Sequence, residues 1–300
     1  MGTTWTARVV GLPVEVKVAT AAVGDALAAV DSSMSTWKPQ SELSRLNRHD
    51  DGGVFEVSPA LREVLERAAE VSALSGGAFD VTVGPLVNAW GFGPSGGSAP
   101  PDDEALEALR RRVGFRQLTL TDAGVVKARG DLEVDLSAIA KGYGVDRAAD
   151  ALERLGARRY LIEVGGELRV RGLNADGVPW QVGVERPDPD GRGVQRVVPL
   201  TDTALATSGD YRNFYERGGK RVSHTIDPRT GRPIEHALAS VTVLDDTCAR
   251  ADALATALNV LGPEAGLALA RREKLSALFL VRQPDGGLVE QGSGRFEGSP

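Results

Sequence analysis

The alternation of apolar and polar residues predicts a mixture of short strands and helices along this chain. Residues 3–18 are expected to form one or two strands, and the alanine-rich run 22–33 is expected to form a helix. Ser58-Pro59 marks the start of another helix, since serine is a favoured N-cap and proline is favoured at the first helical position. Alternation between residues 117 and 136 indicates hairpins.

The second half of the chain continues this mixture. Helices are predicted from about Ala138 to Leu155 and over roughly 248–261, where Gly262 ends the periodic pattern. The strands predicted in this half cover residues 159–164, 167–172, 178–185, 239–244 and 277–281. Because the strands gather in hairpins and do not alternate regularly with helices, the sequence favours an α+β fold of antiparallel hairpins packed with helices.

Length and charge narrow the class of protein. With 300 residues, we expect one domain over residues 1–285, built as one unit or as two closely packed subdomains, and a flexible tail over 286–300. The formal net charge is −6 and no block of five basic residues occurs, so no nucleic-acid partner is expected. No run of 18 apolar residues is present, so no transmembrane segment is expected. No signal peptide is recognisable, which favours the cytoplasm for the chain as given.

The polar loop 222–236 is the most informative stretch. It holds two of the three histidines and is interrupted by Pro228 and Gly231, so it cannot form a regular helix or a central strand. Loops on a rigid scaffold often carry binding groups. His224 is a candidate general base or hydrogen-bond donor beside Asp227. A structural histidine is the alternative.

Two further segments carry candidate chemistry. Asp252 and Thr256 are four positions apart on a predicted helix, so they share a face and offer oxygen ligands suited to Mg²⁺ or Ca²⁺. Asp135 is predicted to end a strand before a helix N-terminus, where Lys141 would suit a nucleotide diphosphate. The alternatives are a solvated helix face for the first pair, and an N-cap at Asp135 or Ser137 for the second.

Two aromatic residues lie in polar loops, Trp37 and Phe79. Each could stack on a planar ring system, and each could pack in the core. The residues alone leave both interpretations open.

Together and in this order, these motifs resemble the FAD:protein FMN transferase family, the ApbE-type flavin transferases. The matching segments are Met1–Thr3, Met34–Trp37, Ser41–Asn47, Gly77–Asp80, Val134–Tyr143, Glu163–Gly166, Ser208–Arg212, Ser223–Pro233 and Ala251–Thr256. The resemblance covers about positions 1–265 and implies an ApbE-like, T-fold-related architecture. This chain departs from the family at Ala255, where many members have an acidic residue.

The resemblance also implies a reaction. Such proteins split the pyrophosphate of FAD with Mg²⁺ and pass FMN to a threonine hydroxyl of a target flavoprotein, releasing AMP. The implied flavin contacts are Met1, Trp37, Ala78, Phe79, Asp80, Asp135, Lys141 and Ile226. The implied metal ligands are the Asp252 carboxylate, the Thr256 hydroxyl and the main-chain oxygen near Ala138. His224 or a nearby carboxylate is the candidate base for the threonine proton.

Two other functions stay open at this point. The chain could be a Mg²⁺-dependent FAD pyrophosphatase that gives free FMN and AMP, or a non-catalytic FAD-binding protein. The family is typically exported and lipid-anchored, yet this sequence has no lipobox cysteine. A cytoplasmic member and an exported lipoprotein given without its leader therefore both remain possible.

Overall fold

The largest element of the structure is an antiparallel sheet. The structure is a computed structural model and describes residues 2–96, 100–188, 191, 193–209, 214–217 and 220–298. Within that part of the chain the sheet has seven strands, in the order β1-β4-β5-β8-β13-β14-β15, and each neighbouring pair is antiparallel. These strands are β1 (Trp5–Val9), β4 (Tyr160–Val164), β5 (Glu167–Arg171), β8 (Thr203–Gly209), β13 (Leu238–Asp245), β14 (Ser276–Arg282) and β15 (Leu288–Ser293).

Strand β14 shows how the sheet separates two hydrophobic cores. Phe279 and Val281 belong to the core on the helical side, whereas Leu278 and Leu280 belong to the core on the other side. Successive side chains of a strand point to opposite faces. An unbroken apolar run here therefore reflects a central strand that is covered on both faces.

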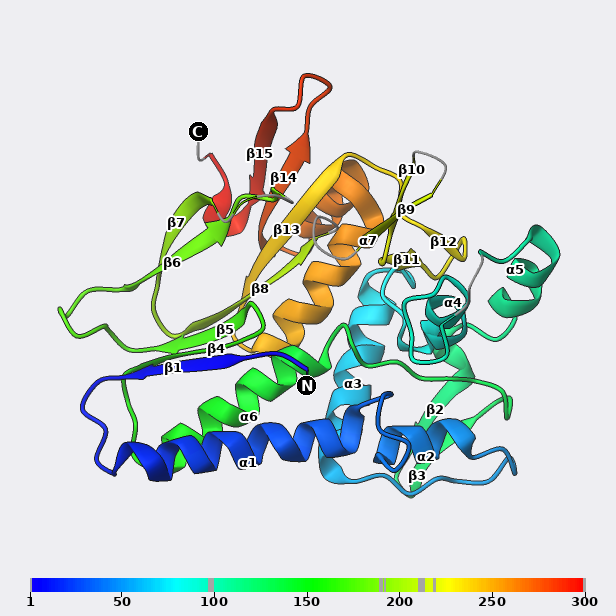
Figure 1. The fold of residues 1–300 in the computed structure, drawn as a ribbon, viewed down its shortest axis with the longest axis horizontal. Helices are drawn as coiled ribbons and strands as arrows, with labels where there is room; N and C mark the ends of the chain where they lie inside the picture. The colour runs from blue at the N-terminus through cyan, green and yellow to red at the C-terminus, as the bar shows by residue number, and fades with distance from the viewer. Residues whose placement is uncertain are drawn as a thin grey trace.

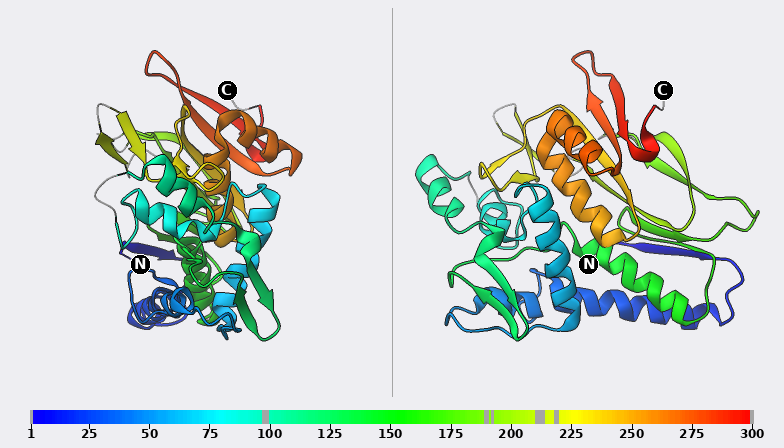
Figure 2. Two further views of the ribbon diagram at one scale, coloured as in Figure 1. Left: turned by 90° about the vertical axis from the view of Figure 1, so that its right-hand side faces the viewer. Right: turned by 180° about the vertical axis from the view of Figure 1, so that it is seen from behind.

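Helices cover one face of the sheet, and a hairpin covers the other. α6 and α7 pack on the helical face, α1 packs against α6, and α3 packs against α7 (Figure 1). The β6–β7 hairpin buries its apolar side chains against the opposite face. The two further views in Figure 2 show the helices and the hairpin on either side of the sheet. These elements are α1 (Val16–Met34), α3 (Pro59–Leu74), α6 (Ala140–Arg154), α7 (Cys248–Arg272), β6 (Trp180–Glu185) and β7 (Val194–Leu200).

Shorter elements fill the region beside the N-terminal turns of α6 and α7. They are α2 (Glu42–Arg48), η1 (Val81–Val83), α4 (Gly84–Ala89), α5 (Asp103–Arg110), η2 (Phe115–Gln117), β2 (Leu118–Thr121), β3 (Gly124–Lys127), β9 (Phe214–Arg217), β10 (Lys220–Ser223), β11 (Ile226–Asp227) and β12 (Arg232–Pro233), with η3 (Gly294–Phe296) at the far end of the sheet. Most of them are joined by loops, so this region supplies many irregular segments that can line a site.

Helices α6 and α7 meet at Gly142 and cap one another. A Cβ atom added to Gly142 would lie 2.3 Å from the Cys248 carbonyl oxygen, so a larger residue cannot fit without a shift. The Asp252 carboxylate of α7 accepts a hydrogen bond from the Gly142 N–H in the first turn of α6, at 3.0 Å. In return, the Asp146 carboxylate of α6 accepts bonds from the N–H groups of Cys248 and Ala249, which open α7, at 3.0 and 2.9 Å. Carboxylates thus satisfy N–H groups at both helix N-termini.

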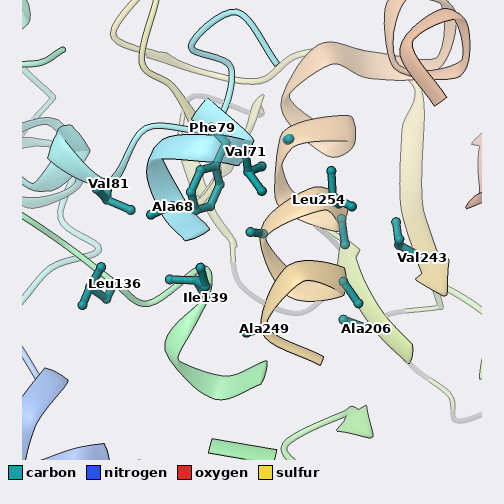
Figure 3. Close-up of a cluster of buried hydrophobic side chains, with 14 of the residues drawn as sticks. Ala68, Val71, Phe79, Val81, Leu136, Ile139, Ala206, Val243, Ala249 and Leu254 are labelled. Carbon is teal, nitrogen blue, oxygen red and sulfur yellow. The ribbon is translucent and has the colours of Figure 1, made fainter. Parts of the chain in front are cut away.

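Helix α7 runs through the helical core. Its side chain Leu254 lies toward Ala206 and Val243 of the sheet, and Phe79 lies on its other side (Figure 3). Among the described residues α7 is the one helix with the length and hydropathy of a membrane span, but 67% of its apolar window is buried inside the protein. Burial of this kind is typical of a core helix. At Gly262 the backbone leaves the helical conformation with a φ of 78°.

The α+β class expected from the sequence is confirmed. The end predicted for the helix over roughly 248–261 also agrees with the break in α7 at Gly262. Ser58 caps α3 as expected, because its hydroxyl accepts a hydrogen bond from the Leu61 N–H at 3.2 Å.

Three expectations need correction. Only Trp5–Val9 of residues 3–18 forms a strand, since Pro13 and the start of α1 at Val16 interrupt the pattern. Asp135 does not end a strand but lies in an irregular segment before α6. The flexible tail expected over 286–300 is wrong up to Phe296, because β15 pairs with β14 and Phe296 is buried.

We expect Gly142→Ala to destabilise the protein by about 1–3 kcal/mol, a usual cost of adding atoms to a packed core. The neighbouring atom is a backbone carbonyl oxygen, which can move only if the two helices separate. The matched control is Gly24→Ala in α1, where an added Cβ meets nothing within 4 Å. That variant should gain up to about 1 kcal/mol from helix propensity. Denaturant unfolding measures both free energies, and effects of the same sign would contradict the close crossing.

Candidate active site

A cavity of about 1030 Å³ opens beside the N-terminal turns of α6 and α7. Its wall is built from segments that are far apart in the sequence, including the loop after α1, the segment before η1, the β4–β5 turn and the loop after β10. The predicted site residues that line it are Trp37, Ala78, Phe79, Asp80, Asp135, Ala138, Lys141, His224, Ile226, Asp252 and Thr256. Met1, also predicted as a flavin contact, lies outside the described residues.

Asp252 is a buried acid of the cavity, with 5% of the residue exposed. Its Oδ2 atom accepts the Gly142 N–H, while Oδ1 accepts no hydrogen bond within the described part of the chain. Burial raises the pKa of the Asp252 carboxyl above its usual value, although the Lys141 charge and the Gly142 N–H oppose this shift. One carboxylate oxygen is thus fixed by the fold, and the other remains available to a ligand.

The oxygen atoms around Asp252 fit a hard divalent cation. Thr256 is one helical turn further along α7 and lines the same cavity. Ala138 lies two residues before α6, and its carbonyl oxygen accepts no backbone hydrogen bond from any described residue. A carboxylate, a hydroxyl and a main-chain carbonyl are the ligand types that Mg²⁺ and Ca²⁺ prefer. No cluster of three His, Cys, Asp or Glu side chains suited to a metal occurs among the described residues, so any ion here depends on such a mixed set.

Lys141 and Glu167 form an ion pair next to this oxygen set. Lys141 is the second residue of α6, and Glu167 is the first residue of β5, directly after the turn formed by Gly165 and Gly166. Burial lowers the pKa of Lys141, but the charges of Asp252 and Glu167 outweigh it, so this pKa lies above its usual value. Burial raises the pKa of Glu167 to about 7, opposed by Lys141 and reinforced by Asp252. Two carboxylates therefore share one ammonium group, and this excess of negative charge also suits a cation.

Trp37 and Phe79, the two aromatic candidates for stacking, lie in different surroundings. Trp37 stands at the cavity wall with 66% of the residue exposed, so its ring can contact a ligand. The Phe79 ring is 2% exposed and packs in the core beside Ala68 and Val71 (Figure 3). Of the two interpretations left open for Phe79, the structure favours core packing for its ring. Phe79 is nevertheless among the residues that line the cavity.

Asp80 uses its carboxylate to hold the cavity wall together. Oδ1 accepts hydrogen bonds from the Thr82 N–H and the Thr82 hydroxyl, and Oδ2 accepts one from the Phe115 N–H at 2.7 Å. Burial raises the pKa of the Asp80 carboxyl, although these three bonds oppose the shift. Any contact of Asp80 with a ligand would therefore involve its main chain or share an occupied oxygen.

Asp135 also binds its own segment. Its carboxylate accepts the Ser137 N–H at 2.8 Å, and its own N–H donates to the Val81 carbonyl oxygen at 2.7 Å. Neither Asp135 nor Ser137 caps α6, because the N-cap position is Ile139 and carries no side-chain cap. The carboxylate that reaches the first turn of α6 comes from α7.

His224 enters the cavity from the loop after β10. Its ring lies edge-on to Phe92, with the ring centroids 6.2 Å apart, and Phe92 stacks on Tyr215. The expected pairing of His224 with Asp227 is not observed, because the Asp227 carboxylate binds the Arg229 guanidinium through both oxygens. An aromatic wall, and not this aspartate, therefore lies beside the imidazole.

The loop that carries His224 and Ile226 is fastened to the helices beside it. The Trp90 indole N–H donates to the Gly231 carbonyl oxygen at 2.8 Å, and the Arg110 guanidinium donates to the Arg229 carbonyl oxygen at 2.8 Å. These bonds fix the far end of the loop to α4 and α5. The polar composition of this segment thus belongs to an ordered structure.

Comparison with known proteins gives a family for this site. Residues 1–279 match the ApbE family. This chain belongs to the ApbE family. An FAD:protein FMN transferase of Vibrio cholerae serotype O1 is 46% identical over 99% of this chain and 90% of its own length, and one of Escherichia coli K12 is 40% identical over 95% and 83%. The apo crystal structure of the Pseudomonas stutzeri flavinyl transferase ApbE superposes with a TM-score of 0.91 at 40% identity, covering 100% of this chain and 95% of that one.

Within this ApbE-family site, sequence reasoning missed two residues. Glu167 follows a glycine turn, and in sequence it resembles an ordinary surface charge. Its signal was present, since Leu168 and Val170 point to the hairpin side and so turn Glu167 toward the helices. Phe92 lies in a Gly/Pro/Ser segment and gave no comparable signal, because its contact with His224 depends on the tertiary fold.

Proposed function

We propose that this chain is a Mg²⁺-dependent FAD:protein FMN transferase that acts on a threonine of a target flavoprotein. The threonine oxygen attacks the phosphorus on the FMN side of FAD, a new P–O bond forms, the pyrophosphate P–O bond breaks, and AMP leaves. The threonine proton passes to a base on the enzyme. Relatives that are 40–46% identical bear the name FAD:protein FMN transferase, which supports the reaction class.

The observation that carries the residue assignment is the shared cavity, which holds an oxygen-ligand set, a lysine at a helix N-terminus and a histidine. The ammonium group of Lys141, in the first turn of α6, would bind pyrophosphate oxygens, since a positive charge forms strong hydrogen bonds to phosphate. Asp252, Thr256 and the Ala138 carbonyl would hold Mg²⁺, which when bound neutralises charge on the leaving phosphate.

The flavin would lie between the loop after α1 and the loop after β10. Trp37 offers an exposed ring for stacking, and the segment Ala78–Asp80 lines the same space as Ile226. In this arrangement Asp135 would contact the ligand from the segment before α6. Met1, as the resemblance implies, would complete the flavin contacts.

His224 is our choice for the base that takes the threonine proton. Its imidazole lines the cavity beside Phe92 and is carried by a loop, so it can face an incoming protein substrate. The carboxylates of Asp80 and Asp135 both accept hydrogen bonds from their own segments, which makes each less suited to the task.

Incubation with FAD and Mg²⁺, with and without a flavoprotein domain that carries a threonine acceptor, tests the proposed function. We expect the acceptor to gain the mass of an FMN group, by intact-mass analysis, and an equal amount of AMP to appear. The acceptor with its threonine changed to valine is the control and should gain nothing. AMP in equal amounts with both acceptors would indicate a pyrophosphatase, and retention of FAD without AMP would indicate a flavin-binding protein.

We expect Asp252→Asn to lower Mg²⁺-dependent turnover by about 100-fold or more, because a bound metal supplies several kcal/mol of charge stabilisation. Asparagine keeps an oxygen for the Gly142 N–H, so the helix cap survives. Asp245→Asn is the matched control, since Asp245 pairs with Arg250 outside the cavity. Turnover is measured as AMP release across a Mg²⁺ titration, and turnover equal to wild type would remove Asp252 from the metal site.

We expect His224→Ala to slow transfer by about 10²–10⁴-fold, the usual contribution of general base catalysis. FAD affinity should stay within about twofold, since a base that acts on the acceptor adds little to ground-state binding. His49→Ala, outside the cavity, is the control. Single-turnover mass analysis and FAD titration separate the two effects, and a large loss of FAD affinity would make His224 a binding residue instead.

A further inference from the structure

Lys141 lies near two carboxylates, those of Glu167 and Asp252, and the two interact with it in different ways. It makes an ion pair with Glu167, whereas the Asp252 carboxylate acts on it through charge without a hydrogen bond. Asp252 meanwhile accepts the Gly142 N–H, from the residue that follows Lys141. The ammonium group is therefore held on the Glu167 side of the cavity, although a second anion lies close by.

Glu167 is placed firmly enough to hold it there. Its side chain is 3% exposed, compared with 37% for Lys141, so the acid is the buried partner and the lysine the partly exposed one. Glu167 begins β5, whose pairing with β4 and β8 fixes its backbone. Its Oε2 atom is buried and has no hydrogen-bond partner among the described residues. Burying an oxygen atom without a hydrogen-bond partner costs free energy, so we expect this placement of Glu167 to serve a function.

Competition between the Lys141 ammonium group and a divalent cation for the Asp252 carboxylate would explain this placement. An ammonium group and a divalent cation bind the same carboxylate oxygen, and either one excludes the other. Lys141 has a flexible stem, and Asp252 is the other carboxylate beside it, since Asp252 accepts the N–H of the next residue, Gly142, and lines the same cavity. Without Glu167, the ammonium would move onto the open Oδ1 atom of Asp252.

We propose that Glu167 is a positioning residue that holds Lys141 away from Asp252 and so keeps the Asp252 carboxylate open to a divalent cation. This inference rests on the proposed function, which places Mg²⁺ at Asp252. In the same arrangement Lys141 keeps its charge at the α6 N-terminus, where it would bind the pyrophosphate and not the metal ligand. Glu167 thereby acts on the metal through Lys141 and does not itself bind it.

Isothermal titration of Mg²⁺ into the full-length protein without FAD tests this through a double-mutant cycle. The variants are Glu167→Gln, Lys141→Met and the two combined. Glu167→Gln should weaken Mg²⁺ binding by about 10–100-fold, as changes to partners of metal-site residues commonly do. Lys141→Met should bind Mg²⁺ at least as tightly as wild type, and adding Glu167→Gln to it should change nothing further.

Other roles of Glu167 predict a different pattern. If Glu167 contributes only negative charge, or ligates the ion itself, Glu167→Gln will weaken Mg²⁺ binding just as much in the Lys141→Met background, which would overturn the proposal. Unchanged affinity in the single variant would overturn it too. A wild-type protein that binds no Mg²⁺ would instead refute the metal part of the proposed function.

Two further variants guard against effects of misfolding. Glu153→Gln removes a carboxylate that pairs with Arg171 at the other end of β5, outside the cavity, and should leave Mg²⁺ affinity unchanged. Glu167→Asp keeps the charge but shortens the reach to Lys141. If Glu167→Gln fails to fold, Glu167→Asp serves in its place, and a loss of affinity that Lys141→Met abolishes supports the same conclusion.

Discussion

The reciprocal capping of α6 and α7 is the constraint on which the site depends. Buried helix N-termini must find acceptors for their free N–H groups. Here Asp146 serves the start of α7, and Asp252 serves the start of α6. The close approach at Gly142 sets the distance at which both carboxylates can reach. A shift of either helix would break hydrogen bonds at both helix N-termini, so two separate sets of hydrogen bonds fix the relative position of the two helices.

The two capping aspartates differ in what else they bind, and this difference locates the function. Asp146 accepts two N–H groups and pairs with Arg169, so its charge is matched within the fold. Asp252 accepts one N–H and has no ion pair with any described residue, while Glu167 pairs with the nearby Lys141. An unmatched buried carboxylate is unfavourable unless a ligand completes it. The carboxylate whose charge is matched less well within the fold, that of Asp252, therefore lies at the cavity wall.

The sequence predicts local relations in this site well and long-range relations poorly. The shared face of Asp252 and Thr256 follows from helical spacing alone, and both line the cavity. The ion pair of Lys141 with Glu167 joins a helix to a strand 26 positions away, which no periodicity encodes. The burial of Phe79 is similar, because a loop aromatic is hidden only by the elements that pack over it.

The boundaries of helices and strands show the same difference between local and long-range effects. Ser58 ahead of proline placed α3 correctly because an N-cap acts within one turn. The glycine-rich composition after residue 286 suggested a loose tail, yet β15 forms because the edge of β14 offers a partner for its backbone. Composition reports what a segment can do alone, and here the neighbouring strand determined the outcome.

One side of the cavity is built on helices and the other on a loop, and the proposed reaction needs both. The side proposed to bind a cation stands on helices fixed by the mutual caps, so Asp252 and Thr256 have little freedom. Its histidine side stands on a loop held by single hydrogen bonds, such as that from Trp90 to Gly231. A phosphorus centre demands accurate placement of charge, whereas a protein acceptor must enter and leave. Rigid helices beside an anchored loop meet these opposing demands in one cavity, which explains why motifs that are weak separately become informative when the fold assembles them.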